Sequence, residues 1–179
     1  MREATLGRKV PKALRPTRCV SRIEMIDLDE LERQGMRCIL FDRDNTVVPR
    51  DSREAPRAVL DWLASARAHG MRCLMVSNNS HRDRVARSAG ELGVEGYPLA
   101  LKPLPFSVRR ACVACGVPPE QTVMIGDQLF TDILSGNLAG METILVRPQC
   151  DTDLPGMGIV RKVERIVVGD AEFEGEDRR

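Results

Sequence analysis

The chain has 179 residues, of which 42% are hydrophobic and 30% charged, and its formal net charge is +1. This balance is typical of a globular domain and excludes an intrinsically disordered chain. No apolar run approaches the ~20 residues of a transmembrane helix, and the N-terminal stretch lacks the apolar core of a secretory signal. We therefore expect a cytoplasmic protein.

The two ends of the sequence carry opposite charge. Residues 1–22 contain seven Lys or Arg residues and one acidic residue, Glu3, whereas the last ten residues, "DAEFEGEDRR", are mostly acidic. We expect a basic N-terminal arm (1–22), a single compact domain (23–169) and a disordered acidic tail (170–179). The arm is either a solvated end or a peripheral contact with an anionic membrane. Core packing accounts for Trp62 and Tyr97, so we expect no nucleic-acid partner.

Between residues 36 and 168, short apolar runs alternate with helical patterns. Apolar runs predict strands over 36–41, 71–77, 97–100, 122–126 and 141–146, and amphipathic patterns predict helices over 55–68, 82–92, 105–115, 130–140 and 159–168. Strands that are apolar on both faces and separated by single helices indicate a parallel sheet with helices on both sides. We therefore expect an α/β, Rossmann-like fold with about five parallel strands.

Six cysteines raise the question of disulfides or metal binding. Cys38 and Cys73 lie in apolar runs, and Cys112 and Cys115 lie in a helical pattern. The pair "CVAC" has the spacing of a zinc or redox site, but no second pair and neither histidine lies near it. We interpret these thiols as reduced core residues, with a metal site as the alternative.

Polar residues stand at or after the ends of four of the predicted strands. In open parallel sheets, ligands bind at the carboxyl ends of the strands, so we expect these side chains to converge. In chain order they are Asp42, Asp44, Ser77, Asn78, Lys102, Asp127 and Asp132.

Two kinds of chemistry meet in this set. Asp42, Asp44 and Asp127 would repel one another without a cation, and hard oxygen ligands without histidine or cysteine suit Mg²⁺. The Ser77 hydroxyl and the Lys102 ammonium are groups that bind phosphate oxygens. Lys102 carries particular weight, because the chain has 23 arginines and four lysines, and no other lysine lies between residues 13 and 161.

The segments "FDRDNTVV", "VSNNS", "LKP" and "GDQLFTDI" resemble, in order, the four motifs of the haloacid-dehalogenase (HAD) superfamily of phosphatases. The resemblance implies that Asp42 is a nucleophile that forms an aspartyl-phosphate and that Asp44 is the general acid and base. It also implies that Mg²⁺ is held by Asp42, by Asp127 and by the backbone carbonyl of Asp44.

The same resemblance assigns the remaining site residues. Ser77, Asn78 and Lys102 would bind the phosphoryl group, and Asp132 would orient Lys102 or a metal-bound water. Arg43 stands between the two aspartates, where the alternation of an extended chain turns it away from both. We interpret Arg43 as a structural residue or as a contact at the rim of the site.

The spacing of the motifs restricts the substrate. HAD phosphatases that close over small substrates carry a cap domain after the first or second motif. Here 35 residues separate Asp42 from Ser77 and 25 separate Ser77 from Lys102, and the predicted helices and strands fill both intervals. We therefore expect a capless protein with an open pocket, which favours a homo-oligomer or a bulky substrate.

A closer resemblance covers almost the whole chain. The segments "LRPTRCVSRIEMIDLDELERQGMRCILFDRDNT", "GDQLFTDILSGNLAGMETILV" and "VRKVERIV" are similar to the YqeG-type group of class IIIA HAD phosphatases and to the mitochondrial-type phosphatidylglycerophosphate phosphatases. This resemblance implies hydrolysis of phosphatidylglycerophosphate to phosphatidylglycerol. The chain departs from the group at Arg43, where an apolar residue is frequent.

Two alternatives stay open. "FDRDNT" also resembles the "DRDGT" of heptose-bisphosphate and histidinol-phosphate phosphatases, which would make the substrate a small soluble sugar or metabolite phosphate. The zinc loop of those enzymes has no counterpart, because residues 78–101 contain His81 and no cysteine. The second alternative is a non-catalytic binding module, which the loss of a catalytic residue would have favoured, yet Asp42, Asp44, Lys102 and Asp127 are all present.

Overall fold

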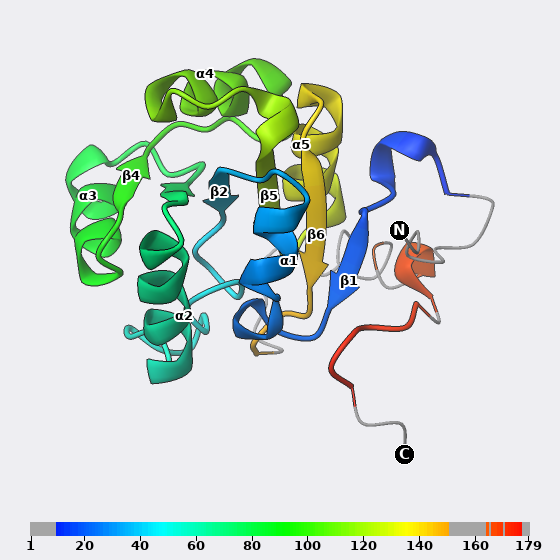
Figure 1. Cartoon of the computed structure of the whole chain (residues 1–179), viewed down its shortest axis with the longest axis horizontal. Helices are drawn as coiled ribbons and strands as arrows, with labels where there is room; N and C mark the ends of the chain where they lie inside the picture. The colour runs from blue at the N-terminus through cyan, green and yellow to red at the C-terminus, as the bar shows by residue number, and fades with distance from the viewer. Residues whose placement is uncertain (1–9, 151–163, 165, 170, 177–179) are drawn as a thin grey trace.

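The computed structural model describes residues 10–150, 164, 166–169 and 171–176. Its centre is a parallel sheet of six strands in the order β1-β6-β5-β2-β3-β4 (Figure 1). The strands are β1 (Arg18–Val20), β2 (Cys38–Phe41), β3 (Arg72–Val76), β4 (Glu95–Tyr97), β5 (Thr122–Gly126) and β6 (Glu142–Val146). The predicted α/β fold with a parallel sheet is confirmed, with six strands in place of about five.

Helices cover both faces of this sheet. They are α1 (Leu28–Arg33), α2 (Arg57–Ala68), α3 (Arg82–Glu91), α4 (Pro105–Cys115) and α5 (Leu134–Ala139). A π-helical turn, Leu129–Ile133, leads into α5, and 3₁₀ turns lie at Lys12–Leu14, Ile23–Met25 and Pro119–Gln121. The bounds of α4 follow directly from its ends, because Pro105 suits a first helical position and Gly116 takes a left-handed backbone that stops the helix.

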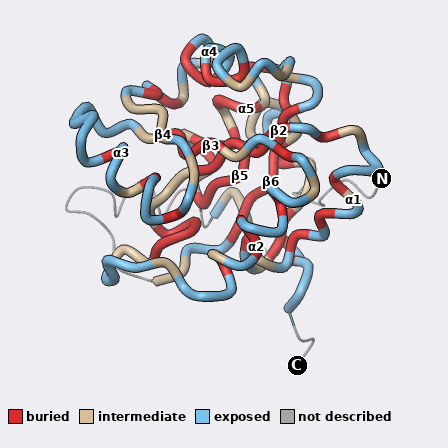
Figure 2. The backbone as a smooth tube through the Cα atoms, turned by 60° about the vertical axis from the view of Figure 1, so that its left-hand side comes forward, coloured by how far each residue is buried: buried red, intermediate tan, exposed pale blue. Residues whose placement is uncertain are grey.

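Successive side chains of a strand point to opposite faces of the sheet. In β2, Ile39 and Phe41 belong to the core shared with α1, α2 and α3, whereas Cys38 and Leu40 belong to the core shared with α4. All four side chains are fully buried, and Figure 2 shows the strands as a buried layer inside more exposed helices. All six cysteines are free thiols, and Cys112 is buried beside Cys38 in the same cluster.

Most predicted elements match the structure to within two residues at each end, and three differ further in position, in kind or in how much of them is described. The strand expected over 97–100 is β4, two residues earlier, where Gly96 approaches α3 so closely that a Cβ would lie 3.0 Å from the Val85 carbonyl oxygen. The helix expected over 130–140 begins as a π-helical turn. The helix expected over 159–168 lies mostly outside the described residues, of which Glu164 and residues 166–168 are helical.

Parts of both charged ends contribute to one edge of the sheet. Strand β1 pairs with β6, and residues 171–176 run beside β1, where the Glu174 N–H donates to the Cys19 carbonyl (2.9 Å) and the Ser21 N–H donates to the Glu174 carbonyl (2.9 Å). Arg18 forms ion pairs with Glu30 (3.0 Å) and Glu174 (2.5 Å). These described parts of the expected arm and tail are packed on the sheet, because pairing between distant segments overrides the local charge pattern.

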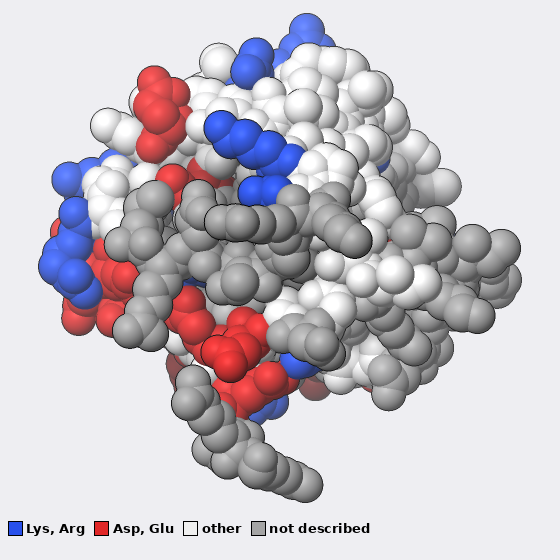
Figure 3. Space-filling model, turned by 90° about the vertical axis from the view of Figure 1, so that its right-hand side faces the viewer, with Lys and Arg blue, Asp and Glu red and all other residues white. Residues whose placement is uncertain are grey.

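The side of the molecule near this edge is not a continuous basic surface in its described part. Figure 3 shows acidic side chains gathered in the lower part of this face and basic side chains in separate groups. Arg15 and Arg22 also have partners within the chain, the Val10 carbonyl (2.8 Å) and Glu24 (3.2 Å). None of the described helices is both long and apolar enough to cross a membrane.

Candidate active site

The carboxyl ends of β2, β3 and β5 lie side by side at the centre of the sheet. Asp42 follows β2, and its N–H donates to the carbonyl of Ile125 in β5 (3.1 Å). Ser77 follows β3, and Asp127 follows β5. The chain crosses from one side of β2 to the other between β4 and β5, and the crevice at such a reversal is where open α/β sheets bind ligands.

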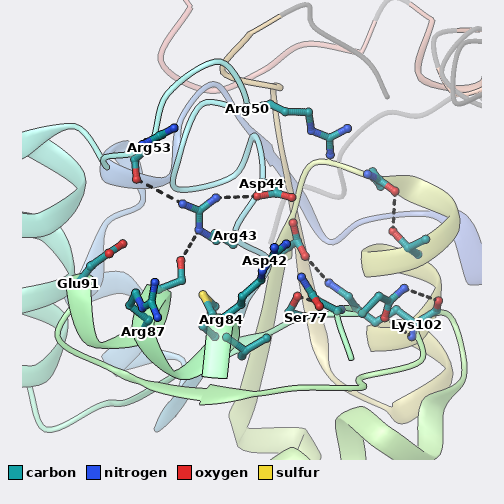
Figure 4. Close-up of a pocket in the computed structure, with 17 residues that line it drawn as sticks. Asp42, Arg43, Asp44, Arg50, Arg53, Ser77, Arg84, Arg87, Glu91 and Lys102 are labelled. Carbon is teal, nitrogen blue, oxygen red and sulfur yellow. Dashed lines mark hydrogen bonds and ion pairs between the residues drawn. The ribbon is translucent and has the colours of Figure 1, made fainter. Parts of the chain in front are cut away.

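An open cavity of about 730 Å³ lies over these strand ends (Figure 4). Asp127 and Asp132 are buried and do not line it, but Asp132 contacts the lining through Lys102. The structure therefore brings the predicted residues to one edge of the sheet, as expected from their positions at or after the strand ends. Those that line the cavity are Asp42, Asp44, Ser77, Asn78 and Lys102.

Lys102 is a buried cation whose side chain is only 2% exposed. Its Nζ donates to Oδ1 of Asp42 (2.7 Å), to Oδ1 of Asp132 (2.7 Å) and to the carbonyl oxygen of Val76 (3.1 Å). These three acceptors match the three protons of an ammonium, so the group is satisfied and fixed in position.

Asn78 holds the backbone of Lys102. Its Oδ1 accepts from the Lys102 N–H (2.8 Å), and its Nδ2 donates to the Lys102 carbonyl (3.0 Å). Both polar atoms of the side chain are therefore engaged. The Asn78 side chain therefore positions Lys102, and the phosphate-binding role expected for Asn78 stays a prediction.

Burial governs the protonation of this group. It raises the pKa of Asp42 to about 6, although the Lys102 ammonium opposes the shift. Burial likewise raises the pKa of Asp132, again against the effect of Lys102. Burial by itself would lower the pKa of Lys102, but the carboxylates of Asp132 and Asp42 outweigh it and raise that pKa. The lysine therefore stays protonated, and two carboxylates share its charge.

A tight turn after β2 places Asp44 at the mouth of the cavity. Asn45 has a left-handed backbone (φ 62°), which Asn tolerates better than most residues. Thr46 Oγ1 donates to Asp127 Oδ1 (3.3 Å), and this contact ties the turn to β5. The Asp44 carboxylate is 48% exposed and accepts from a guanidinium N–H of Arg43 (2.8 Å). The polar run that follows the strand is therefore an ordered turn.

The oxygen atoms at this edge fit Mg²⁺. Asp42 and Asp127 follow two adjacent strands, and Thr46 links the turn that contains Asp44 to Asp127. Carboxylate and carbonyl oxygens without histidine or cysteine are the ligands that Mg²⁺ prefers in proteins. The donor set therefore suits a hard divalent cation.

A second group of possible metal ligands lies elsewhere among the described residues. Asp29, Glu32 and His69 place one ligand atom each within 4.8 Å of one another, but Asp29 and Glu32 are exposed and none of the three lines the cavity. His69 already contacts Asp29 (3.1 Å) and the Ser65 carbonyl (2.8 Å), and these two hydrogen bonds raise its pKa. We assign no metal to this group.

The sequence did not single out four arginines of the cavity wall. Arg50 and Arg53 lie in the segment between β2 and α2, and Arg84 and Arg87 lie on α3. Their spacing of three residues does indicate that Arg84 and Arg87 share a helical face. The direction of that face depends on how α3 packs against the sheet, which the sequence alone does not show.

Comparison with known proteins identifies the family. Residues 100–151 match the family model described as HAD-hydrolase-like. The chain is 34% identical over 160 residues to the "Probable phosphatase YqeG" of Bacillus subtilis, and this match covers 89% of the chain and 92% of that protein. It is 27% identical to the chloroplastic phosphatidylglycerophosphate phosphatase 1 of Chlamydomonas reinhardtii and 28% identical to the chloroplastic/mitochondrial one of Arabidopsis thaliana. These two matches each cover 82% of the chain but only 58% and 44% of those relatives.

The fold agrees with that of solved HAD proteins. NagD from E. coli K-12 matches with a TM-score of 0.55 at 15% sequence identity, over 69% of this chain and 92% of that one. This likeness concerns the fold alone, whereas the similarity to YqeG extends over nearly the whole sequence. The chain therefore belongs to the HAD-like hydrolases, within the family of YqeG-type phosphatases.

Proposed function

We propose that this phosphatase hydrolyses a phosphomonoester through an aspartyl-phosphate on Asp42. A carboxylate oxygen of Asp42 attacks the phosphorus, and the bond from phosphorus to the alcohol oxygen breaks while Asp44 gives that oxygen a proton. Water then attacks the phosphorus while Asp44 takes a proton from it, the bond from phosphorus to the Asp42 oxygen breaks, and inorganic phosphate leaves with the Asp42 carboxylate regenerated. Position supports these roles, since Asp42 lines the cavity from a strand end and Asp44 is half exposed, where a leaving alcohol would depart.

Lys102 and Ser77 bind the transferring phosphoryl group in this proposal. The ammonium is held by Asp132 and donates to Asp42, so a phosphoryl group transferred to Asp42 would take over the proton that the free carboxylate now accepts. A cation that is fixed before the reaction stabilises developing charge without reorganisation. We assign Asp132 and Asn78 as positioning residues, because both act through Lys102.

Mg²⁺ would be held by the carboxylates of Asp42 and Asp127 and by the backbone carbonyl of Asp44. When bound, the ion supplies positive charge that neutralises the phosphoryl oxygens. Thr46 would keep the Asp127 carboxylate oriented through its hydrogen bond of 3.3 Å.

We further propose that the substrate is phosphatidylglycerophosphate and the product phosphatidylglycerol. The observation that carries this choice is an apolar rim beside Lys102, which consists of Leu99, Leu101, Leu104 and Phe106. These side chains are between 41% and 49% exposed, although leucine and phenylalanine are usually buried. Such a rim suits contact with the apolar part of a bilayer surface.

The rim is built into the framework of the cavity. The Leu99 N–H donates to the carbonyl of Asn79, which lines the cavity (3.1 Å). Leu99 and Leu101 have left-handed backbones (φ 53° and 46°), a conformation that costs L-residues on the order of 1–2 kcal/mol. Ala100 and Lys102 are buried while these two leucines are exposed. The chain thus accepts local strain to expose apolar side chains in the segment that leads to Lys102.

The names of two relatives support the lipid substrate, and the contacts of the basic arm bear on which surface would meet a membrane. Two relatives are named phosphatidylglycerophosphate phosphatases, although the chain covers only about half of their length. We propose the rim, rather than the basic arm, as the peripheral membrane contact, because Arg15, Arg18 and Arg22 each bind groups within the chain. A small soluble phosphate is the alternative substrate, which the open cavity would also admit.

The test is phosphate release from phosphatidylglycerophosphate in detergent micelles, beside a panel of soluble phosphomonoesters, with Mg²⁺ and with EDTA. Mg²⁺-dependent preference for the lipid that Asp42→Asn abolishes would support the whole proposal. Preference for a soluble ester would keep the mechanism and overturn the substrate. Absence of turnover on every ester would contradict the catalytic proposal.

A further inference from the structure

The wall of the cavity carries more positive charge than one phosphoryl group requires. Its described lining has six basic side chains and three acidic ones. The basic ones are Arg43, Arg50, Arg53, Arg84, Arg87 and Lys102, and the acidic ones are Asp42, Asp44 and Glu91. Lys102 and the proposed Mg²⁺ already serve the phosphoryl group, so the arginines are in excess.

One of these arginines, Arg43, already has hydrogen-bond partners for its guanidinium within the chain. Arg43 donates to the Asp44 carboxylate (2.8 Å), to the Arg53 carbonyl (3.3 Å) and to the Ser88 hydroxyl on α3. It thereby ties the segment after β2 to α3. These are the two elements that carry the other arginines, so Arg43 holds them in a fixed relation across the cavity.

Arg84 and Arg87 differ from Arg43 in the contacts of their guanidinium groups. They lie three residues apart on the face of α3 that lines the cavity, and both are exposed. In the described part of the chain, neither guanidinium has a hydrogen-bond or ion-pair partner, and Glu91 on the same wall pairs with neither. Two unpaired guanidinium groups therefore face the cavity from one helix.

Arg50 stands on the other side. Figure 4 shows Arg50 and Arg53 on one side of the two aspartates, and Arg84 and Arg87 on the other. Nε and Nη1 of Arg50 are buried and lack a hydrogen-bond partner among the described residues. Arg50 thus lies across the two aspartates from the pair on α3 and does not share a binding position with it.

We propose that Arg84 and Arg87 form a second anion subsite, which binds a phosphate-type oxyanion that the substrate carries beside the phosphoryl group to be hydrolysed. The inference rests on the proposed function of the same site. Guanidinium groups bind phosphate oxygens through paired N–H donors, and a neutral alcohol needs no such contacts. The subsite selects substrates with two oxyanions, and the second can be a phosphodiester or another phosphomonoester.

The test compares three soluble substrates: 1-propyl phosphate, 1,3-propanediol bisphosphate and a short-chain, water-soluble phosphatidylglycerophosphate. We expect kcat/KM of the wild type to be about 10- to 1,000-fold higher for each substrate with a second oxyanion, because charge-assisted hydrogen bonds contribute strongly. In the double variant Arg84→Gln/Arg87→Gln this preference should fall by at least tenfold, chiefly through KM. The two doubly anionic substrates show which kind of second group the subsite favours.

Arg82→Gln is the matched control, because Arg82 is exposed on the same helix but does not line the cavity. It should keep the wild-type preference, and so should Arg50→Gln, because Arg50 lies across the two aspartates from the pair, with circular dichroism as a check on folding. Equal kcat/KM for all three substrates in the wild type, or an unchanged preference in the double variant, would overturn the subsite while leaving the phosphatase proposal intact. Failure of the wild type on all three would overturn the proposed function and the subsite with it.

Discussion

A Cβ atom at Gly126 would lie 2.3 Å from the carboxyl group of Asp132. The end of β5 therefore leaves room for Asp132 only because residue 126 has no side chain. Asp132 in turn accepts from Nζ of Lys102 (2.7 Å) and from the Gln128 N–H (3.2 Å). The absence of a side chain at Gly126 therefore allows Asp132 to hold the Lys102 ammonium in its buried position.

Gly126→Ala should impair both stability and catalysis. The new methyl group would displace Asp132, and overpacking of this kind costs roughly 1–3 kcal/mol of unfolding free energy. Lys102 would move with its partner, and a displacement of about 1 Å can lower a rate about 100-fold. Urea unfolding and turnover of a soluble phosphomonoester measure the two effects.

Gly90→Ala provides the control for this change. Gly90 lies in α3, and a Cβ there would meet nothing within 4 Å. Alanine in a helix interior stabilises by roughly 0.5–1 kcal/mol relative to glycine, so this variant should be as active as the wild type and slightly more stable. Wild-type stability and turnover in Gly126→Ala would show that this contact does not position Lys102.

Lys102→Met should destabilise the protein by roughly 3–5 kcal/mol, because it leaves the Asp42 and Asp132 carboxylates without their shared cation. The Asp132 side chain is only 1% exposed, so water cannot easily compensate. Adding Asp132→Asn should restore part of the loss by removing one of the buried charges. Urea unfolding of the wild type, both single variants and the double variant measures the coupling free energy between Lys102 and Asp132. Strictly additive losses of unfolding free energy would contradict the coupling.

Much of the framework follows from hydrophobic periodicity. Strand β5 has the predicted bounds because its five residues are buried on both faces, which makes the apolar run unambiguous. The rule that parallel strands present ligand-binding groups at their carboxyl ends was sufficient to associate Asp42 with Lys102, although 60 residues separate them. Both predictions rest on signals that are local in the sequence.

Other features depend on contacts that no local signal reports. Strand β1 has three residues and exists through its pairing with β6, far along the chain. The hydrogen bonds of Asn78 to the Lys102 backbone arise only when two loops meet. The exposure of Leu99 and Leu101 likewise depends on left-handed backbone angles, which a run of apolar letters does not predict.

Ionisation of Asp42 should lower the stability of the folded protein between pH 4 and 6. The pKa of Asp42 is about 6 in the folded chain, above its ordinary value of 3.8, because of burial. In this interval the folded state holds a proton that the unfolded state has lost, so the free energy of unfolding falls as the pH rises. In EDTA, urea unfolding should show a steeper fall for the wild type than for Asp42→Asn. Parallel curves would contradict the raised pKa.

The apolar rim beside Lys102 makes a separate prediction about membrane binding. Leu104 and Phe106 are nearly half exposed at the start of α4, whereas Val113 is 79% exposed seven residues later on the same helix, about 10 Å along its axis. If the rim enters a bilayer surface, its side chains contribute to binding while Val113 does not.

Leu104→Ser/Phe106→Ser should therefore weaken binding to phosphatidylglycerol-containing vesicles by at least tenfold, since full burial of such side chains stabilises by roughly 1.5–3 kcal/mol each. Val113→Ser should bind like the wild type. Vesicle sedimentation measures the affinities, and turnover of a soluble phosphomonoester checks that the cavity is intact. An equal loss in the control would indicate a general apolar effect. Unchanged vesicle binding in the double variant would remove the rim from membrane contact and favour a soluble substrate.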